Sequence, residues 1–230
     1  MNPKQRQLLI VIAVIIVAAI AFIAVVSIAN SPSGPDIDYA SIPQSRTEDG
    51  AFVLGHEDAP VTIIEFADWA CSHCQSYRGT IESFIRNEVI PGRAKLEFRV
   101  FPTTGGQLTV YAGQIAECAE LQKTGAFWEL QPFLYELAMT GRYTEDIGRE
   151  VANRLGLDYS QLLTCSSEST RVTTDANFGR TGGVQGTPAI MVRYGDGAAN
   201  FITYNGTTYS RSEVPLDVLS GVVNLANTSG

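Results

Sequence analysis

The chain has 230 residues, with 24 acidic side chains against 16 basic ones, which gives a formal net charge of −8 at neutral pH. The basic residues form no cluster, so the composition argues against a protein that binds nucleic acid through a positive surface. About 185 residues follow the apolar N-terminal segment and its tether, which is the size of one domain with an elaboration.

An almost unbroken apolar run occupies residues 8–29 and contains Ser27 as its only polar side chain. This length matches the roughly 20 residues that cross a bilayer as a helix. Two basic residues precede the run and two aspartates follow it, so the positive-inside rule places residues 1–7 in the cytoplasm. Ser27-Ile28-Ala29 resembles a signal-peptide cleavage site, but the apolar core of such a peptide is normally about 7 to 15 residues. The sequence favours a retained single-pass anchor in the cell membrane, with an extracytoplasmic domain.

Residues 30–50 are predicted to form a flexible linker. Serine, proline, glycine and aspartate dominate its first part, and its apolar residues show little periodicity. We expect the folded domain to occupy residues 51–230.

The first strand of this domain is predicted at 61–67, and it leads to the sequence Cys71-Ser72-His73-Cys74. A helix is predicted directly afterwards, because apolar residues recur there every three or four positions. These residues are Cys74, Tyr77, Ile81, Phe84, Ile85 and Val89. Two cysteines in the first turn of a helix lie close enough to form a disulfide, and the free N–H groups there stabilise the first as a thiolate. Cys71 is therefore predicted to be the exposed exchanging cysteine and Cys74 the resolving one.

Other kinds of site also use two cysteines with this spacing. A c-type haem site needs a histidine directly after the second cysteine, where this chain has Gln75, and a structural zinc site needs a second ligand pair that the sequence lacks. A purely structural disulfide does not need a helix terminus. The sequence favours a redox-active dithiol that uses no metal and no separate cofactor.

The rest of the chain alternates between strand and helix patterns. A strand is predicted at 95–101, and a helical insertion at about 107–180 follows it. Helix-period residues in this insertion lie at 108–121, 127–139, 144–155 and 159–178. Strands at 189–194 and 201–204 and a helix at 215–226 complete the predicted α/β domain.

Cys118 and Cys165 both lie in the predicted helical insertion. In an oxidising compartment, a remaining pair of cysteines is most simply a structural disulfide, which would contribute about 4 kcal/mol for a loop of this length. Two buried free thiols are an alternative. A second redox pair that exchanges electrons with the first is another.

Three segments together resemble the DsbA-like branch of the thioredoxin superfamily, over about 51–226. They are Cys71 to Cys74, the strand segment 59–66 before it, and Gly186-Thr187-Pro188 before a second apolar strand. The resemblance implies a thioredoxin-like fold with an inserted helical subdomain. It also implies a cis peptide bond before Pro188, in a loop that packs beside the cysteines and binds the substrate backbone through Thr187 and Pro188.

The resemblance assigns roles to two further residues. Glu65 matches the buried carboxylate of the family, which helps to move the proton of the resolving cysteine; a strand glutamate that faces water is the alternative. His73 is expected to stabilise the Cys71 thiolate by a hydrogen bond or by its charge, with an exposed loop histidine as the alternative. Ser72 stands where many members carry proline, so the resemblance does not fix the reduction potential.

The resemblance implies a protein-disulfide oxidoreductase, and an oxidase is the favoured interpretation. It would donate its Cys71–Cys74 disulfide to cysteine-containing translocated proteins, and a membrane quinone-linked thiol oxidase would reoxidise it. The chain lacks the dimerisation domain of dimeric isomerases, which favours a monomer. A disulfide reductase or isomerase of the same fold remains an alternative because relatives of all these kinds share Thr187. A nonenzymatic module that binds metal or peptide is a further alternative.

Overall fold

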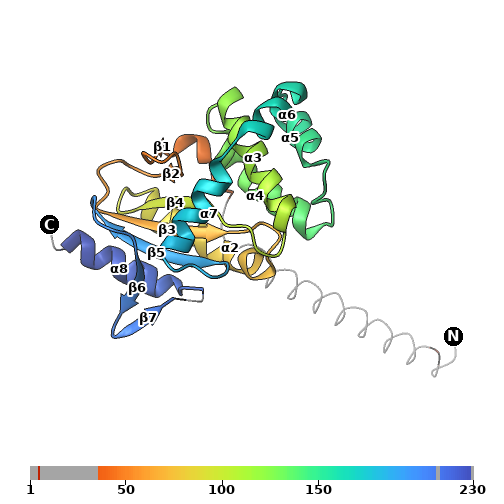
Figure 1. Ribbon diagram of the computed structural model, residues 1–230. Coiled ribbons are helices and arrows are strands. Elements are labelled where there is room, and N and C mark those ends of the chain that lie inside the picture. Colours follow the sequence, from red (N-terminus) through yellow and green to blue (C-terminus); the bar gives the residue numbers. More distant parts are fainter. Residues whose placement is uncertain (1–4, 6–35, 211–212, 229–230) are drawn as a thin grey trace. The chain divides into compact units, whose positions relative to one another are not determined.

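A mixed sheet lies at the centre of residues 36–230, the unit that contains the predicted catalytic domain (Figure 1). In the part of the chain that the structure describes, its strands lie in the order β1-β2-β4-β3-β5-β6-β7. The strands are β1 (Gln44–Arg46), β2 (Phe52–Leu54), β3 (Val61–Ala67), β4 (Lys95–Val100), β5 (Ala189–Tyr194), β6 (Asn200–Tyr204) and β7 (Thr207–Tyr209). The predicted strands at 61–67, 95–101, 189–194 and 201–204 are therefore confirmed to within a residue.

The central strand β3 pairs in parallel with β4 and antiparallel with β5. All seven of its residues are buried. Successive side chains point to opposite faces, so Ile63 joins the larger apolar cluster while Ile64 and Phe66 join the smaller one. A strand that is covered on both faces needs apolar residues at nearly every position, which explains its continuous apolar run.

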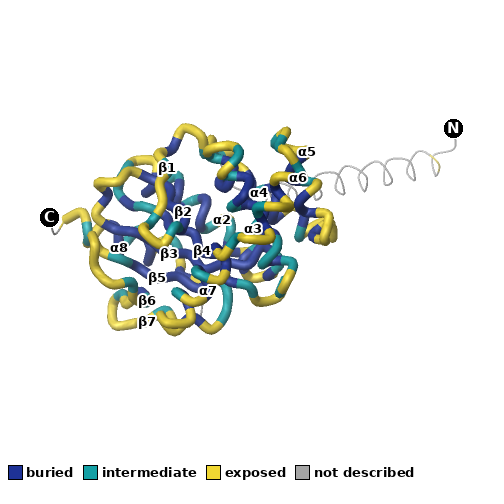
Figure 2. The backbone as a smooth tube through the Cα atoms, turned by 45° about the horizontal axis from the view of Figure 1, so that its top comes forward, coloured by how far each residue is buried: buried dark blue, intermediate teal, exposed yellow. Residues whose placement is uncertain are grey.

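Helices cover both faces of the sheet. On one face α2 (Ser72–Phe84), which continues into the π-helical turn η2 (Ile85–Val89), packs beside α8 (Leu216–Thr228). On the other face α7 (Arg171–Thr181) packs against β4 (Figure 1). The strands between these helices are drawn as buried in Figure 2. The predicted apolar face of the helix after the cysteines is confirmed, because all six of its residues are buried.

The predicted helical insertion is confirmed as the segment between β4 and β5. It consists of α3 (Gly106–Gln122), α4 (Ala126–Met139), α5 (Ile147–Leu155), α6 (Tyr159–Glu168) and α7. The single helix predicted at 159–178 is wrong, because the chain breaks between α6 and α7. Ser169 has an extended backbone, and its hydroxyl accepts a hydrogen bond from the N–H of Arg171 at 3.4 Å. Such local hydroxyl bonds compete with helical hydrogen bonds and favour a break.

The predicted linker at 30–50 is wrong in its second half. Residues 44–46 form β1, which pairs antiparallel with β2, and Ile42 before them is buried. The carboxylate of Asp49 lies 2.6 Å from the guanidinium of the buried Arg99. The three-residue edge strand was missed because Gln44-Ser45-Arg46 has no apolar alternation.

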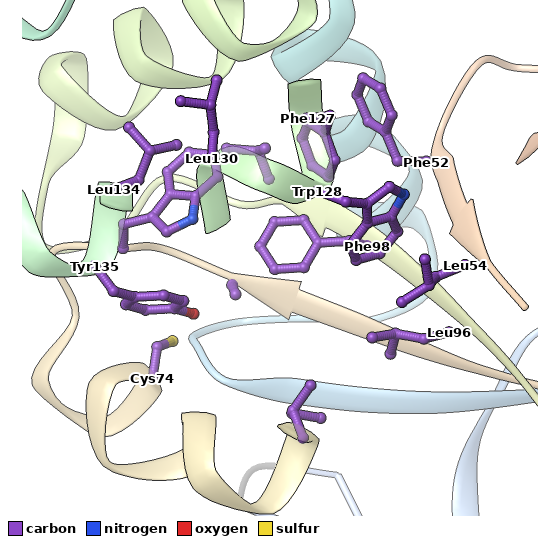
Figure 3. Close-up of a cluster of buried hydrophobic side chains, with 14 of the residues drawn as sticks. Phe52, Leu54, Cys74, Leu96, Phe98, Phe127, Trp128, Leu130, Leu134 and Tyr135 are labelled. Carbon is purple, nitrogen blue, oxygen red and sulfur yellow. The ribbon is translucent and has the colours of Figure 1, made fainter. Parts of the chain in front are cut away.

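Aromatic side chains join the helical insertion to the sheet (Figure 3). Phe127 of α4 stacks on Phe52 of β2, with ring centroids 3.5 Å apart. Phe98 of β4 lies edge-on to both Phe127 and Trp128, at centroid distances of 5.7 and 6.4 Å. Aromatic contacts of this kind add specific geometry to a large buried area. They fix α4 over the end of the sheet where the cysteines lie.

The structure is a computed structural model that describes Gln5, residues 36–210 and residues 213–228. The anchor predicted at 8–29 lies outside the described residues. The first part of the predicted linker also lies outside them, and so do all of residues 1–7 except Gln5. No helix in the described ranges has the length and apolar character needed to cross a membrane.

Candidate active site

Cys71 and Cys74 lie at the N-terminus of α2, directly beyond the carboxyl end of β3. Cys71 is the N-cap residue, with an extended backbone, and its carbonyl accepts a hydrogen bond from the N–H of Gln75 at 3.0 Å. Cys74 lies in the first turn. Both cysteines are free, so the structure holds the dithiol form of the pair. The helix terminus leaves backbone N–H groups pointing at the Cys71 sulfur.

The prediction that Cys71 is exposed is wrong, because only 6% of its surface is accessible. The reason is a contact with a loop that comes 116 residues later in the chain. The Cys71 sulfur donates a hydrogen bond to the carbonyl oxygen of Thr187 at 3.4 Å, and the peptide bond between Thr187 and Pro188 is cis. The structure therefore brings the two cysteines and the predicted substrate-binding loop together.

The two sulfurs have different ionisation behaviour. Burial raises the pKa of Cys71, but hydrogen bonds from the Thr187 side chain and from the N–H groups of Cys74 and His73 outweigh it, and the net pKa is below its ordinary value. Burial raises the pKa of Cys74, and the charge of Glu65 raises it further. Cys71 is thus the sulfur that becomes a thiolate first, while Cys74 holds its proton.

Glu65 lies on β3 beneath the cysteines and is 2% exposed. Burial raises its pKa to about 8, which favours the protonated carboxyl near neutral pH. The side chain lines a small cavity of about 30 Å³ together with Gln131 and Tyr135 of α4. Apolar side chains, among them Leu96 and Phe98, form much of the rest of its lining. In Figure 3 the Tyr135 side chain reaches from α4 toward Cys74.

The expected role of the His73 side chain is not supported by its position. Its ring is 77% exposed and lies 3.6 Å from the carboxylate of Glu213. Residues at this point of the first helical turn face solvent, and it is the backbone N–H of His73 that bonds to the Cys71 sulfur. His73 contributes to the site through its backbone.

Sequence reasoning missed a buried carboxylate beside the cysteines. Asp68 follows β3 directly and is fully buried. One carboxylate oxygen accepts from the N–H of Thr103 at 2.7 Å and from the N–H of Gly105 at 2.9 Å; the other accepts from the N–H of Ala70 at 3.0 Å and from the Thr109 hydroxyl. The available signal was an acidic residue at the carboxyl end of a buried strand.

The other pair of cysteines is joined. Cys118 of α3 and Cys165 of α6 form a disulfide with a Cα–Cα distance of 5.9 Å. The bond lies within the helical insertion and closes a loop of 47 residues. The alternative of two free thiols therefore does not describe this structure.

Comparisons with known proteins agree with this geometry. The family model described as thioredoxin matches residues 47–196, which is more than half of the chain. The solved structure of Wolbachia pipientis alpha-DsbA1 has a TM-score of 0.64 at 16% sequence identity, and the match covers 80% of this chain and 94% of that one. This structural likeness concerns the fold.

Two curated relatives differ in how much of their length is matched. The Na(+)/H(+) antiporter NhaA 3 of Salinispora tropica is 30% identical over 145 residues, which are 61% of this chain and 21% of that protein. The disulfide bond formation protein D of Bacillus subtilis is 26% identical over 153 residues, which are 62% of this chain and 68% of that protein. The chain thus spans about a fifth of the antiporter and two thirds of the Bacillus protein.

The family match covers β3, the cysteine pair, the helical insertion and the cis-proline loop, all of which the structure brings into one site. The chain therefore belongs to the thioredoxin family, and it has the fold with a helical insertion that is found in DsbA proteins.

Proposed function

We propose that the protein is a thiol-disulfide oxidoreductase, and that it acts as an oxidase which donates its Cys71–Cys74 disulfide to other proteins. The observation that carries this proposal is the Cys71 sulfur itself. It lies at a helix N-terminus and accepts hydrogen bonds from the N–H groups of His73 and Cys74 and from the side chain of Thr187 in the cis-proline loop. These contacts stabilise the thiolate, which is the reduced form, and a stabilised reduced form makes a disulfide oxidising.

The reaction begins with the oxidised pair. A thiolate of the substrate protein attacks the Cys71 sulfur, the Cys71–Cys74 bond breaks, and a mixed disulfide forms while Cys74 leaves as a thiolate and takes up a proton. A second substrate thiolate then attacks the substrate sulfur of the mixed disulfide and releases the Cys71 thiolate. Two electrons have moved from the substrate to the dithiol. The buried, protonated carboxyl of Glu65, whose charge acts on Cys74, is the proposed donor of this proton.

Substrates are expected to bind along the cis-proline loop. A hollow of about 270 Å³ beside this loop is lined by Gln185, Gly186, Thr187, Pro188 and Ser210. Its lining is polar and uncharged, so it suits the backbone of an extended peptide better than a charged or strongly apolar side chain. This composition favours cysteine-containing polypeptides of broad sequence as substrates.

Location and partners follow from the sequence at the N-terminus and from the relatives. The apolar run at 8–29 supports a cell-membrane anchor with the catalytic domain on the extracytoplasmic side. A donor that is left reduced after each turnover needs a reoxidant, which we propose to be a membrane quinone-linked thiol oxidase. The name of the Bacillus subtilis relative, disulfide bond formation protein D, agrees with the oxidase role.

Trapping of mixed disulfides in cells tests the proposed activity. Cys74→Ala removes the resolving sulfur, so substrates should accumulate as adducts that dithiothreitol releases. Cys71→Ala is the matched control and should trap none, because it removes the exchanging sulfur and leaves the rest of the site. Absence of adducts on Cys74→Ala, or equal adducts on both variants, would contradict an oxidoreductase that acts through Cys71.

A further inference from the structure

The Asp68 carboxylate accepts hydrogen bonds from side-chain hydroxyls as well as from backbone N–H groups. Besides its backbone contacts, it accepts a hydrogen bond from the Thr103 hydroxyl at 3.1 Å. The Thr103 hydroxyl oxygen in turn lies 2.8 Å from the hydroxyl oxygen of Thr187. Thr187 carries the carbonyl that touches the Cys71 sulfur. Hydrogen bonds thus link a buried carboxylate to Thr187, the residue whose carbonyl contacts the exchanging cysteine.

The donors and acceptors along this chain have a fixed direction. A hydroxyl group has one proton to donate, and a carboxylate only accepts. The Thr103 proton is committed to Asp68, so in the bond between the two threonines the Thr187 hydroxyl is the donor. The Thr187 proton therefore points at Thr103.

The Thr187 side chain is also among the groups that lower the pKa of Cys71, and the carbonyl of the same residue lies 3.4 Å from the Cys71 sulfur. While Cys71 is a thiol, its own proton goes to the Thr187 carbonyl and the hydroxyl is not needed. Once Cys71 is a thiolate it can only accept, and the single Thr187 proton must then serve either the sulfur or Thr103. The two acceptors compete for one donor.

We propose that Asp68 and Thr103 are positioning residues that draw the Thr187 hydroxyl toward Thr103, weaken its hydrogen bond to the Cys71 thiolate, and so set how oxidising the dithiol is. Asp68 acts through Thr103, and Thr103 acts as the competing acceptor. The pair limits the stabilisation of the thiolate that the helix terminus and the cis-proline loop would otherwise provide. The proposal rests on Cys71 being the exchanging cysteine of the proposed function.

Thr103→Val tests the competition directly. The exposed side chain keeps its shape but loses the acceptor, so the Thr187 proton becomes free to bond to the thiolate. We expect the pKa of Cys71 to fall by about half a unit to one unit, the size of one net hydrogen bond. The measurement is the rate of iodoacetamide alkylation of Cys71 against pH, read by mass spectrometry on the full chain in mild detergent.

Three matched variants make the test specific. Thr103→Ser keeps the hydroxyl and should retain the wild-type pKa. Thr203→Val removes one hydroxyl of another exposed threonine pair, whose oxygens lie 2.9 Å apart in the β6–β7 hairpin, and should have no effect. In a Thr187→Val background the effect of Thr103→Val should disappear, because no proton is left to release.

An unchanged or raised Cys71 pKa in Thr103→Val would overturn the proposal, as would an effect that persists in the Thr187→Val background. Exchange of wild-type Cys71 with oxidised glutathione is measured as a separate test of the proposed function. Its absence would overturn the proposed function, while the alkylation data would still decide the role of Thr103.

Discussion

Replacement of Glu65 by glutamine should change how the stability of the protein depends on pH. The carboxyl lies on the central strand, is 2% exposed, and has a pKa that burial raises from 4.5 to about 8. Between these two values the folded protein keeps the carboxyl proton while the unfolded chain releases it. The folded state then binds more protons, so the free energy of unfolding falls as the pH rises through this window.

The size of this effect follows from the width of the window. One pKa unit corresponds to about 1.4 kcal/mol, so burial of Glu65 costs about 3 kcal/mol of stability at pH 7 and about 5 kcal/mol above pH 8. Glutamine stays neutral. Glu65→Gln should therefore match the wild type near pH 4 and exceed its stability by about 3 kcal/mol at pH 7. The buried Asp175, whose pKa burial raises to about 6, is present in both proteins and cancels.

Urea unfolding at a series of pH values measures this difference. Both proteins should carry Cys71→Ala and Cys74→Ala so that neither sulfur titrates. Glu57→Gln, which replaces an exposed acid, is the matched control, and its free energy of unfolding should differ from that of the parent by the same amount at every pH. One result would refute the argument that this carboxyl is buried and neutral. That result is a difference in unfolding free energy between Glu65→Gln and the parent that stays constant from about pH 4 to pH 8.

Three further changes have expected outcomes. Joint replacement of Cys118 and Cys165 by alanine should cost about 4 kcal/mol of unfolding free energy because a 47-residue loop is opened, while exchange by the active-site cysteines persists; calorimetry and a glutathione assay check both. Gly113→Ala should cost about 1–3 kcal/mol in urea unfolding, because the new Cβ would lie 2.5 Å from a Val172 methyl group and force α3 away from α7. Trp69→Phe should cost about 1–3 kcal/mol by the same assay, because it leaves the buried side-chain oxygen of Gln131 in α4 without its 3.0 Å hydrogen bond.

The parts of the fold that the sequence predicts are those with strong local patterns. The buried strand β3 is continuously apolar, and the helix after it has an apolar residue at every third or fourth position. Both patterns arise from burial and are visible without knowledge of the partners. The edge strand β1 and the break between α6 and α7 lack such patterns, because pairing with β2 and a hydroxyl bond at Ser169 decide them.

The site shows the same division. The position of Cys71 at a helix start was predictable from its neighbours in the sequence. Its burial was not, because it depends on Thr187, which lies 116 residues away. The part played by Asp68 depends likewise on residues 103–109, the loop before α3 and the first turn of that helix, which meet it only in the folded domain. The side chain of His73 was assigned by resemblance, and the geometry turns it toward Glu213 instead.

The equilibrium reduction potential of Cys71–Cys74 tests the central claim most directly. Titration of the full chain with glutathione, with mass spectrometry to report this pair apart from Cys118–Cys165, gives the value. An oxidase that stabilises its Cys71 thiolate should lie near the potential of DsbA, about −120 mV. A value near that of thioredoxin, about −270 mV, would contradict the oxidase assignment and identify a reductant.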